Sequence, residues 1–495
     1  MPMKKLKIFF LSSEVTPFAK TGGLADISYS LPKALKELGN EVRIMMPKYK
    51  MINDRRYVLR EVIRLKEIPV SIGGIDRKIN VKSAFTPDQD KLQVYFIDSR
   101  PYFGREGLYV DPQTNLDYPD NDERFILFAK GVLSTLKLLF WQPDIIHCND
   151  WQTALVPFLI KTLYKDDEFF KRVATVLTIH NVGYQGNFPP ESFYRIGVDS
   201  NLFKPGSNIE YFGQFSFLKT GIYYADYLTT VSEQYAREVQ TSEEYGLGFE
   251  GIFAERSSVF SGIINGIDYT IWDPETDRLI PARYSSSELS GKVDNKRALT
   301  KRFKLTFDER IPIIGIISRL TPQKGFDLIE EIALELLKMN IQIVILGIGD
   351  KKYQNLFKEL SKDYPGKIGI SFNFDEQLAH LIEAGSDMFL MPSRYEPCGL
   401  NQLYSLRYGT VPIVRKTGGL ADTITEFDSE QGTGNGFVFE EYNSKALLKT
   451  VQRAVKVYKD TKLWKKLMRN GMKQDFSWSA SAKQYTKIYE KIMVK

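Results

Sequence analysis

The chain has 495 residues, of which 43% are hydrophobic and 26% are charged. This length exceeds what one hydrophobic core supports, so we expect two or three domains. The formal net charge is +6, from 67 basic and 61 acidic residues, and this near balance does not indicate a nucleic-acid partner.

Two cysteines, Cys148 and Cys398, lie far apart in the sequence. At most one disulfide could form, so a reducing compartment is expected. The apolar run near the N-terminus ends at Ser12, Ser13 and Glu14 and is too short for a signal peptide. No apolar run in the sequence is long enough to span a bilayer. We therefore expect a cytoplasmic protein with no membrane partner.

Short apolar runs alternate with longer segments of helical period, which is the pattern of a parallel sheet covered by helices. A helix is predicted after Gly23, because Leu31, Leu35 and Leu38 share one face and Gly39 ends it. The strands predicted in the first half are Lys7–Ser13, Glu41–Pro47, Leu92–Asp98, Asp144–Cys148, Ala174–Ile179 and Tyr227–Val231.

The second half repeats this alternation. The segment Asp273–Arg297 has few apolar residues and reads as a connection between domains, and Phe476–Lys495 predicts an amphipathic helix. Two doubly wound α/β domains that face each other follow from this order, with ligands at the carboxyl ends of the strands. The predicted elements are strands Pro312–Ile317, Ile341–Leu346, Ile368–Phe372, Met388–Met391 and Val411–Val414, and helices Leu328–Leu337 and Tyr353–Leu360.

The string Lys-Thr-Gly-Gly-Leu-Ala-Asp occurs twice, at Lys20–Asp26 and at Lys416–Asp422. Paired glycines let backbone N–H groups approach a ligand closely, and a helix N-terminus behind them favours negative charge. Two copies, one near each end of the chain, predict two similar domains that offer anion-binding turns to one diphosphate. For a single copy, a helix-start turn with tightly packed glycines is an equal alternative.

Polar residues follow two neighbouring predicted strands. His180 and Asn181 end one strand, where this fold class places function. His180 could orient a substrate or stabilise developing charge, and a structural histidine is the alternative. Asp150 follows the preceding strand and could bind a sugar hydroxyl or cap a helix. His147 and its neighbouring cysteine point to opposite faces of a strand, so they do not chelate a metal together.

Arg319 and Lys324 follow the predicted strand Pro312–Ile317. Two cations there suit a diphosphate leaving group, because they neutralise the charge that grows as the bond breaks. They could also replace a divalent metal. The Asp-x-Asp patterns at positions 88/90 and 120/122 favour a surface turn and a helix cap. We therefore predict no essential metal.

Glu396 precedes a turn formed by Cys398, Gly399 and Leu400, with a predicted helix behind it. The carboxylate could accept hydrogen bonds from sugar hydroxyls, and the exposed N–H groups of the turn could bind phosphate. A capped helix start is the alternative, but the combination with Arg319 and the second glycine string favours function.

These residues together resemble bacterial glycogen synthase and plant starch synthase, in the same order over nearly the whole chain. The resemblance implies the GT-B fold, with two facing Rossmann-like domains and a C-terminal helix that crosses back to the first. The implied bounds are 1–262 for the acceptor-side domain, 263–475 for the nucleotide-sugar domain and 476–495 for the helix. The matching strings are Lys20–Asp26, His180-Asn181, Ser318-Arg319-Leu320, Lys324-Gly325, Glu396–Leu400, Thr417–Gly419 and Phe476–Trp478.

The resemblance implies retaining transfer of glucose from ADP-glucose to the non-reducing-end 4-hydroxyl of an α-1,4-glucan such as glycogen, with release of ADP and no cofactor. It leaves the oligomeric state open. The implied catalytic residues are His180, Arg319, Lys324 and Glu396. The implied substrate contacts are Lys20, Gly22, Gly23, Tyr109, Asp150, Asn181, Asn265, Phe374 (on the adenine), Cys398, Gly399, Leu400, Thr417, Gly418 and Gly419.

Many retaining GT-B enzymes carry a second Glu eight positions after the first, where this chain has Tyr404. Bacterial glycogen synthases share this departure. No carboxylate pair is then evident for double displacement, so we hypothesise that the leaving phosphate oxygen deprotonates the incoming 4-hydroxyl. The alternatives are a UDP-glucose donor or another acceptor, a non-catalytic glucan-binding protein, and a pyridoxal-phosphate phosphorylase, for which no Schiff-base lysine motif is evident.

Overall fold

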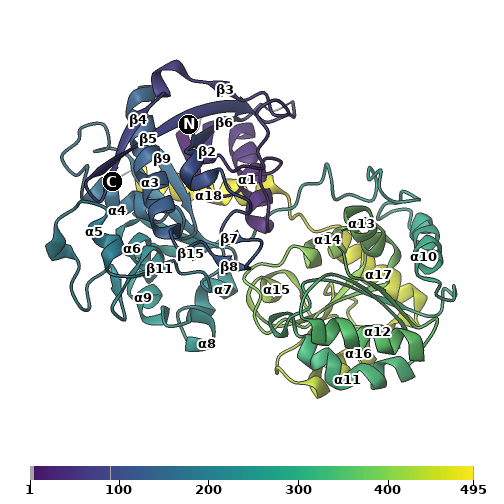
Figure 1. The fold of residues 1–495 in the computed structure, drawn as a ribbon. Helices are drawn as coiled ribbons and strands as arrows, with labels where there is room; N and C mark the ends of the chain where they lie inside the picture. Colours follow the sequence, from purple (N-terminus) through teal and green to yellow (C-terminus); the bar gives the residue numbers. More distant parts are fainter. Residues whose placement is uncertain (1–4, 90, 374, 494–495) are drawn as a thin grey trace. The chain divides into compact units, whose positions relative to one another are not determined.

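The computed structural model describes residues 5–89, 91–373 and 375–493, which divide into two compact units (Figure 1). Unit 1 runs up to Val231 and adds Ala236–Gly266 and the segment from Trp478 onward. Unit 2 comprises Ser232–Tyr235 and Ile267–Ser477. The units therefore divide after Gly266 and Ser477, where the sequence suggested divisions after residues 262 and 475.

Unit 1 is built on a sheet of ten strands among the described residues. The strands from β15 to β6 run parallel, and β5 runs antiparallel to its neighbours β6, β3 and β4. The order across the sheet is β15 (Phe260–Gly262), β14 (Tyr227–Thr230), β10 (Ala174–Ile179), β9 (Ile145–Asn149), β1 (Lys7–Leu11), β2 (Glu41–Pro47), β6 (Gln93–Asp98), β5 (Ile75–Phe85) and β3 (Arg60–Glu61), with β4 (Ile68–Ile72) paired to β5.

The parallel strands of unit 1 are apolar on both faces because helices cover both faces. Phe9 and Phe10 of β1, adjacent in sequence, are both fully buried. The helices of the first half are α1 (Gly23–Glu37), α2 (Arg100–Phe103), α3 (Asn121–Leu139), α4 (Leu155–Lys161), α5 (Glu191–Tyr194), α6 (Phe217–Tyr224), α7 (Glu233–Glu238), α8 (Glu243–Gly246) and α9 (Glu250–Glu255). The first half also contains two small sheets. One pairs β7 (Val110–Asp111) with β8 (Leu116–Asp117). The other has the order β11 (Asn187–Phe188), β13 (Gln214–Ser216) and β12 (Glu210–Tyr211).

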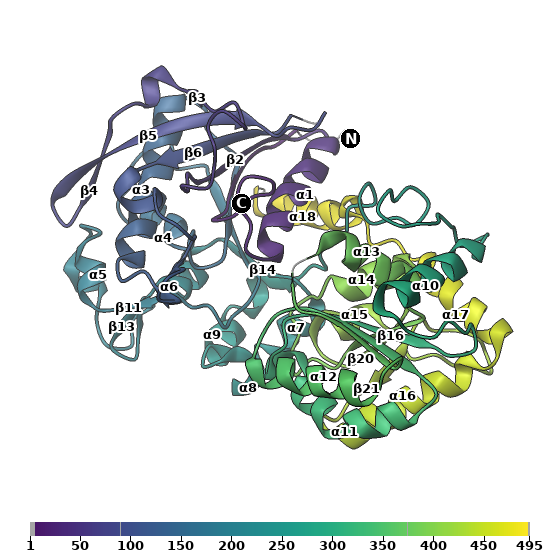
Figure 2. The ribbon, with the colours of Figure 1, turned by 45° about the vertical axis from the view of Figure 1, so that its right-hand side comes forward.

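The C-terminal segment forms helix α18 (Trp478–Met493), as the apolar spacing predicted, and it lies beside α1 (Figures 1 and 2). Tyr489 of α18 is fully buried, and its hydroxyl lies 2.6 Å from Nδ1 of His147 on β9. Nε2 of the same ring lies 2.6 Å from the hydroxyl of Thr178 on β10. His147 is therefore a structural histidine that fastens the last helix to the sheet.

Unit 2 contains a parallel sheet of six strands in its described residues. Its order is β18 (Ile368–Ser371), β17 (Gln342–Leu346), β16 (Ile313–Ile317), β19 (Met388–Met391), β20 (Val411–Arg415) and β21 (Phe437–Phe439). The five strands predicted here are confirmed within one residue at each end, whereas β21 was not predicted.

Helices cover both faces of the unit 2 sheet. Leu299 of α10 (Ser290–Phe303) and Ile382 of α13 (Glu376–Gly385) belong to one buried apolar cluster. A larger cluster joins strands of the sheet to α11 (Phe326–Lys338), α12 (Lys351–Asp363), α16 (Ser444–Tyr458) and α17 (Thr461–Met472). The remaining helices are α14 (Asn401–Arg407) and α15 (Gly418–Thr423).

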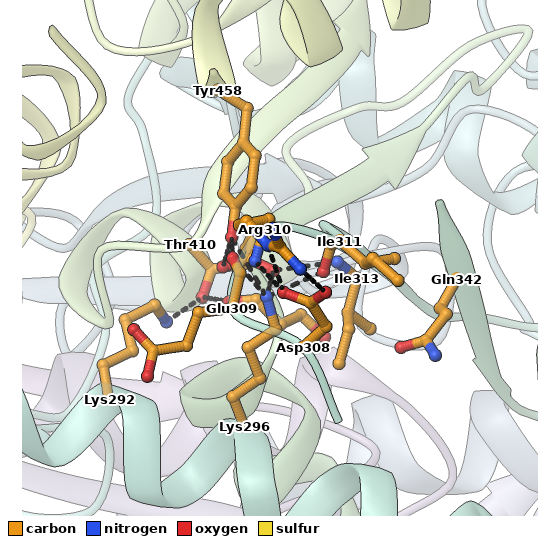
Figure 3. Close-up of polar contacts among 12 residues, drawn as sticks. Lys292, Lys296, Asp308, Glu309, Arg310, Ile311, Ile313, Gln342, Thr410 and Tyr458 are labelled. Atoms are coloured by element: carbon orange, nitrogen blue, oxygen red, sulfur yellow. Dashed lines mark hydrogen bonds and ion pairs between the residues drawn. The ribbon is translucent and has the colours of Figure 1, made fainter. Parts of the chain in front are cut away.

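The segment Asp273–Arg297, predicted to connect two domains, lies inside unit 2, so that prediction was wrong. Polar rather than apolar side chains hold its last part in place, as Figure 3 shows for two lysines of α10. Lys292 Nζ donates to the Thr410 hydroxyl at 2.7 Å, and Lys296 Nζ donates to the Ile311 carbonyl at 2.8 Å. Burial lowers the pKa of Lys292 to about 7. A count of apolar residues misses such anchoring.

Candidate active site

Both sheets have a point where the strand order reverses. In unit 1, β1 lies between β2 and β9, and in unit 2, β16 lies between β17 and β19. Doubly wound sheets bind ligands at the carboxyl ends of the strands at this point, because the connections there diverge and leave a crevice. The loops after β1, β9, β16 and β19 carry most of the predicted site residues.

The first glycine string follows β1 and is held by Glu14, which sequence reasoning missed. The buried Glu14 carboxylate accepts hydrogen bonds from the Thr21 N–H at 2.5 Å and from the Tyr109 hydroxyl at 2.8 Å. A weaker bond comes from the Gly22 N–H at 3.3 Å. The available signal was its place directly after the first strand. Tyr109, for which the resemblance implied a contact with substrate, thus stands beside the loop.

Gly22 has no structural reason to be glycine. Its φ of −154° is extended backbone that any residue adopts, and a Cβ built there would meet nothing within 4 Å. Open space above a glycine is what close approach of a ligand requires. Gly23 begins α1. Lys20 is half exposed and pairs with Asp26 at 2.7 Å, so its ammonium lies beside the loop.

Asp150 and His180 are brought together at the ends of β9 and β10. The Asp150 carboxylate accepts the His180 N–H at 2.7 Å, so it does not act as the cap of the following helix. Asp150 has a φ of +55°, and a non-glycine residue in this region marks strain that often accompanies function. Burial raises the pKa of Asp150 to about 7.

The hydrogen bonds of His180 define its tautomer. Asn149 donates through Nδ2 to the Leu11 carbonyl at 2.8 Å, so its Oδ1 is the atom that faces His180 Nε2 at 2.9 Å. Nε2 therefore carries the proton, and Nδ1 is left as an acceptor with no partner among the described residues. Burial lowers the pKa of His180 to about 3, so the ring is neutral at physiological pH.

Two further predicted residues lie in unit 1. Asn265 is buried, and its Oδ1 has no hydrogen-bond partner within the described chain. Asn181 accepts the Gly183 N–H at 2.9 Å and thereby shapes the loop after His180. An unpartnered buried oxygen of this kind calls for a ligand or water.

In unit 2, Arg319 is exposed at the carboxyl end of β16, and its guanidinium has no hydrogen-bond or ion-pair partner among the described residues. The Gly347–Gly349 loop packs directly on this turn, because a Cβ on Gly347 would lie 1.8 Å from the Ser318 carbonyl oxygen. These glycines thus support the Arg319 turn.

Lys324 and Glu396 form an ion pair with Nζ and Oε2 2.5 Å apart. Both side chains are largely buried, with 19% and 8% of their areas exposed. The Ser393 hydroxyl donates to the same carboxylate oxygen at 3.0 Å. Lys324 lies in a single 3-10 turn, Pro322–Lys324, which ends at Gly325. A Cβ on Gly325 would lie 2.1 Å from the Pro392 carbonyl oxygen, so the turn packs closely on the β19 loop.

The turn before α14 offers two backbone donors. The N–H groups of Gly399 and Leu400 have no partner among the described residues. Asn401, the first residue of α14, donates through Nδ2 to the Ile317 carbonyl at 2.6 Å, which ties this turn to the end of β16. Cys398 is buried and its thiol is not in a disulfide. The predicted cations and the predicted N–H donors of unit 2 thus share one edge of the sheet.

The second glycine string packs on this turn rather than opening outward. A Cβ on Gly418 would lie 2.0 Å from the Glu396 carbonyl oxygen, and φ of Gly418 is +44°. The Gly419 N–H donates to that same carbonyl at 3.1 Å, and the Thr417 N–H donates to Arg415. These two N–H groups are therefore not available to phosphate in this structure. Glycine is required here for close packing, unlike at Gly22.

Tyr404, which replaces the second Glu, lies in an aromatic stack. The centroid of its ring lies 3.9 Å from that of the stacked Trp272 ring. The Trp272 ring also stacks on the His380 ring, at 3.8 Å between centroids. His380 is in turn hydrogen-bonded to Asp277 at 2.8 Å. The tyrosine thus has a packing role in unit 2.

One predicted residue, Phe374, lies outside the described residues. The described residues contain no group of three or more His, Cys, Asp or Glu side chains that could hold a metal ion. A search of the same residues found no helix with the length and hydropathy of a membrane span.

Comparisons with known proteins agree with this architecture. Residues 7–255 match the family model described as starch synthase catalytic domain, and residues 298–474 match the model described as glycosyl transferases group 1. The glycogen synthase of Desulforudis audaxviator is 48% identical, covering 99% of this chain and 97% of its own length. That of Thermosipho africanus is 46% identical, covering 99% and 100%.

Solved structures give the same answer. The catalytic domain of Starch Synthase IV from Arabidopsis thaliana, bound to ADP and acarbose, superposes with a TM-score of 0.89 at 33% identity, covering 99% of this chain and 100% of that one. A sucrose-phosphate synthase from Thermosynechococcus elongatus, at 15% identity and a TM-score of 0.60, shares the fold alone. The chain has the two-domain GT-B fold and belongs to the glycogen synthase and starch synthase family.

Proposed function

We propose that this protein is a glycogen synthase. It transfers glucose from ADP-glucose to the non-reducing-end 4-hydroxyl of an α-1,4-glucan, retains the anomeric configuration and releases ADP. Membership of the family supports the reaction, and the Arabidopsis relative that was solved with ADP supports the donor over UDP-glucose. Neither Cys148 nor Cys398 is in a disulfide, which is consistent with a cytoplasmic location.

The observation that carries the proposal is the edge of the unit 2 sheet where β16 and β19 end. Arg319 and Lys324 lie in the loop after β16, and the N–H groups of Gly399 and Leu400 lie in the loop after β19, which the Lys324–Glu396 ion pair joins to the first. Two cations and two oriented backbone dipoles match the two phosphates of a nucleoside diphosphate. They stabilise the products more than the substrate, because negative charge on the leaving oxygen grows as the glycosidic bond breaks. No metal or cofactor enters the proposal.

Unit 1 is proposed to supply groups that bind sugar. His180 Nδ1 and Asn265 Oδ1 are acceptors without protein partners, and sugar hydroxyls are the donors that suit them. Asp150 holds His180 in position through the backbone and could accept a further hydroxyl. The first glycine string, open above Gly22, would receive the donor phosphates together with Lys20.

The mechanism follows from where the carboxylates lie. Glu396 is paired with Lys324, and the position that carries a second Glu in many retaining enzymes is the stacked Tyr404. A carboxylate held by a lysine and a serine hydroxyl is a weak nucleophile, which makes a covalent glucosyl intermediate on Glu396 unfavourable. We therefore infer that the departing phosphate oxygen takes the proton of the incoming 4-hydroxyl on the same face of the sugar.

A coupled assay of ADP release tests this function. ADP-glucose should yield ADP at a high rate with glycogen present and at a rate near background without it. A protein that only binds glucan would release no ADP in either case. ADP release that is equal with and without glycogen would indicate hydrolysis and would contradict the proposed transfer.

A further inference from the structure

The exposure of the Phe212 side chain and the conformation of the Phe212 backbone are both unfavourable. It stands at the tip of the β12–β13 hairpin, in a loop of two residues, Phe212 and Gly213, between the paired Tyr211 and Gln214. Its side chain is 87% exposed. A single exposed apolar side chain is ordinary, but a large exposed ring with other exposed apolar groups nearby calls for an explanation.

The backbone at this tip has φ of +47° at Phe212 and +79° at Gly213. Two-residue hairpin loops with positive φ at both positions favour Asn-Gly, because asparagine tolerates the left-handed region and phenylalanine does not. Folding stability alone would thus select asparagine at position 212. Conformational strain at an exposed position is one of two observations that point to a function of the Phe212 side chain. The other is the connection of this hairpin to the loop after His180.

The tip is held rigidly. The Glu210 carboxylate accepts the Gly213 N–H at 2.5 Å and the Gly206 N–H at 2.7 Å. The Tyr211 hydroxyl packs so closely on Gly248 that a Cβ there would lie 2.0 Å from it. Phe212 contacts Tyr211 edge to face, at 4.7 Å between ring centroids and an interplanar angle of 77°, which leaves its own ring in a defined orientation.

A series of contacts connects this tip to the loop after His180. Gln185 donates through Nε2 to the Leu247 carbonyl at 3.0 Å, and Leu247 lies next to the Gly248 that receives Tyr211. In that loop Tyr184 is 58% exposed, and Leu247 is 40% exposed. Exposed apolar groups therefore extend from the end of β10 to the tip of the hairpin, all within unit 1.

We propose that Phe212, together with Tyr184 and Leu247 of the connected loops, forms a secondary binding surface for the acceptor α-glucan, beyond the sugar that reacts. The C–H-lined face of a pyranose ring packs on an aromatic face, which removes apolar surface of both from water, and a rigid ring loses little entropy on binding. This inference rests on the proposed function and deepens it, because it assigns where a long acceptor chain is held.

Phe140 provides a matched control. It is 84% exposed and has a φ of +51° at the C-terminus of α3. It precedes β9, at the opposite end of that strand from Asp150, and no aromatic contact of Phe140 is found in the described chain. Phe140 thus shares the exposure and backbone of Phe212 but not its position near the carboxyl ends of the strands.

The test compares Phe212→Asn, Phe212→Tyr and Phe140→Asn in the full-length protein. We expect Phe212→Asn to keep or raise the Tm, because asparagine suits the turn. Its KM for glycogen should rise about three- to ten-fold, the fold-change of one aromatic contact, while its KM for maltotriose and for ADP-glucose stays within about two-fold. Phe212→Tyr and Phe140→Asn should match wild type.

Retardation in native gels that contain glycogen gives a readout without catalysis. The proposal predicts reduced retardation for Phe212→Asn alone. Equal KM and equal retardation of Phe212→Asn and Phe140→Asn would overturn it, as would an equal loss in Phe212→Tyr, since that variant keeps the ring. Absence of glucose transfer in the wild type, with glycogen retardation still dependent on Phe212, would instead refute the proposed function and leave the binding surface standing.

Discussion

Lys324 and Glu396 neutralise each other, with Nζ and Oε2 2.5 Å apart in a largely buried site at the carboxyl edge of the unit 2 sheet. The lysine belongs to the loop after β16, and the glutamate belongs to the loop after β19. The pair therefore holds together the two loops that carry the other groups proposed to bind the diphosphate. A bound diphosphate would share the lysine with the glutamate, so the site keeps its cation in position before the donor arrives.

Lys324→Ala should lower kcat by about 100-fold or more, because it removes a cation whose effect is greatest when the leaving phosphate is most charged. The variant should also lose about 2 kcal/mol of stability, since Glu396 then stays buried without its partner. Lys416→Ala is the control, because Lys416 is 56% exposed and its ion-pair partner, Glu440, is exposed as well. A kcat of Lys324→Ala within a few-fold of wild type would refute the role assigned to this lysine.

The two glycine strings should respond in opposite ways to alanine. Gly418→Ala should destabilise the protein by about 2 kcal/mol or more, because its Cβ would collide with the Glu396 carbonyl at positive φ. Gly22→Ala should change stability by no more than about 0.5 kcal/mol and yet raise the KM for ADP-glucose. Denaturant unfolding and donor kinetics on both variants measure this. A destabilised Gly22→Ala, or a Gly418→Ala as stable as wild type, would show that the two loops are equivalent.

Asp150 should make stability depend on pH. Burial raises its pKa to about 7, against about 3.9 in an unfolded chain. The native state therefore keeps a proton that the unfolded state loses, and the stability that this proton contributes is complete below about pH 4 and is lost as the pH rises through about 7.

Asp150→Asn cannot ionise, so its stability relative to wild type should increase between pH 4 and pH 8. We expect an increase of about 2 kcal/mol, because partial exposure of Asp150 to water limits the effect. Its transfer activity should fall, since the carboxylate is proposed to serve the sugar. Denaturation midpoints at pH 4.5, 6 and 8 provide the measurement. A stability difference that is constant with pH would contradict the raised pKa.

Tyr404→Phe should keep activity within about three-fold of wild type, because the ring that stacks on Trp272 is preserved. Tyr404→Glu should destabilise unit 2 and should not gain a covalent intermediate. Intact-mass spectrometry after reaction with ADP-glucose distinguishes the mechanisms. A glucosyl adduct on any side chain of the wild type would rule out proton transfer to the leaving phosphate on one face.

The parallel strands and the residues after them were predictable because a doubly covered sheet leaves continuous apolar runs in the sequence. The bounds of β2, β10 and β19 agree with those predicted. The β4–β5 hairpin was missed, since its residues alternate between buried and exposed and carry many charges. Asp273–Arg297 was misassigned because polar groups such as Asp277, bonded to His380, hold it in place.

The site was predictable wherever a motif carried it. Glu14 belongs to no motif, and its role depends on Thr21 and Tyr109 meeting it in space. The different packing of Gly22 and Gly418 cannot be predicted from two identical strings, because it depends on whether the backbone of another segment lies against the glycine. The orphan Nδ1 of His180 also follows only from the tautomer that Asn149 imposes.

The most direct test of the central claim is glucan elongation with labelled ADP-glucose and UDP-glucose side by side, with glycogen as the acceptor. Wild-type protein should incorporate glucose from ADP-glucose at least about ten-fold faster, a difference of about 1.4 kcal/mol in transition-state binding. The new linkages should be removed by a hydrolase specific for α-1,4 bonds. No incorporation from ADP-glucose, or faster incorporation from UDP-glucose, would contradict the proposed function.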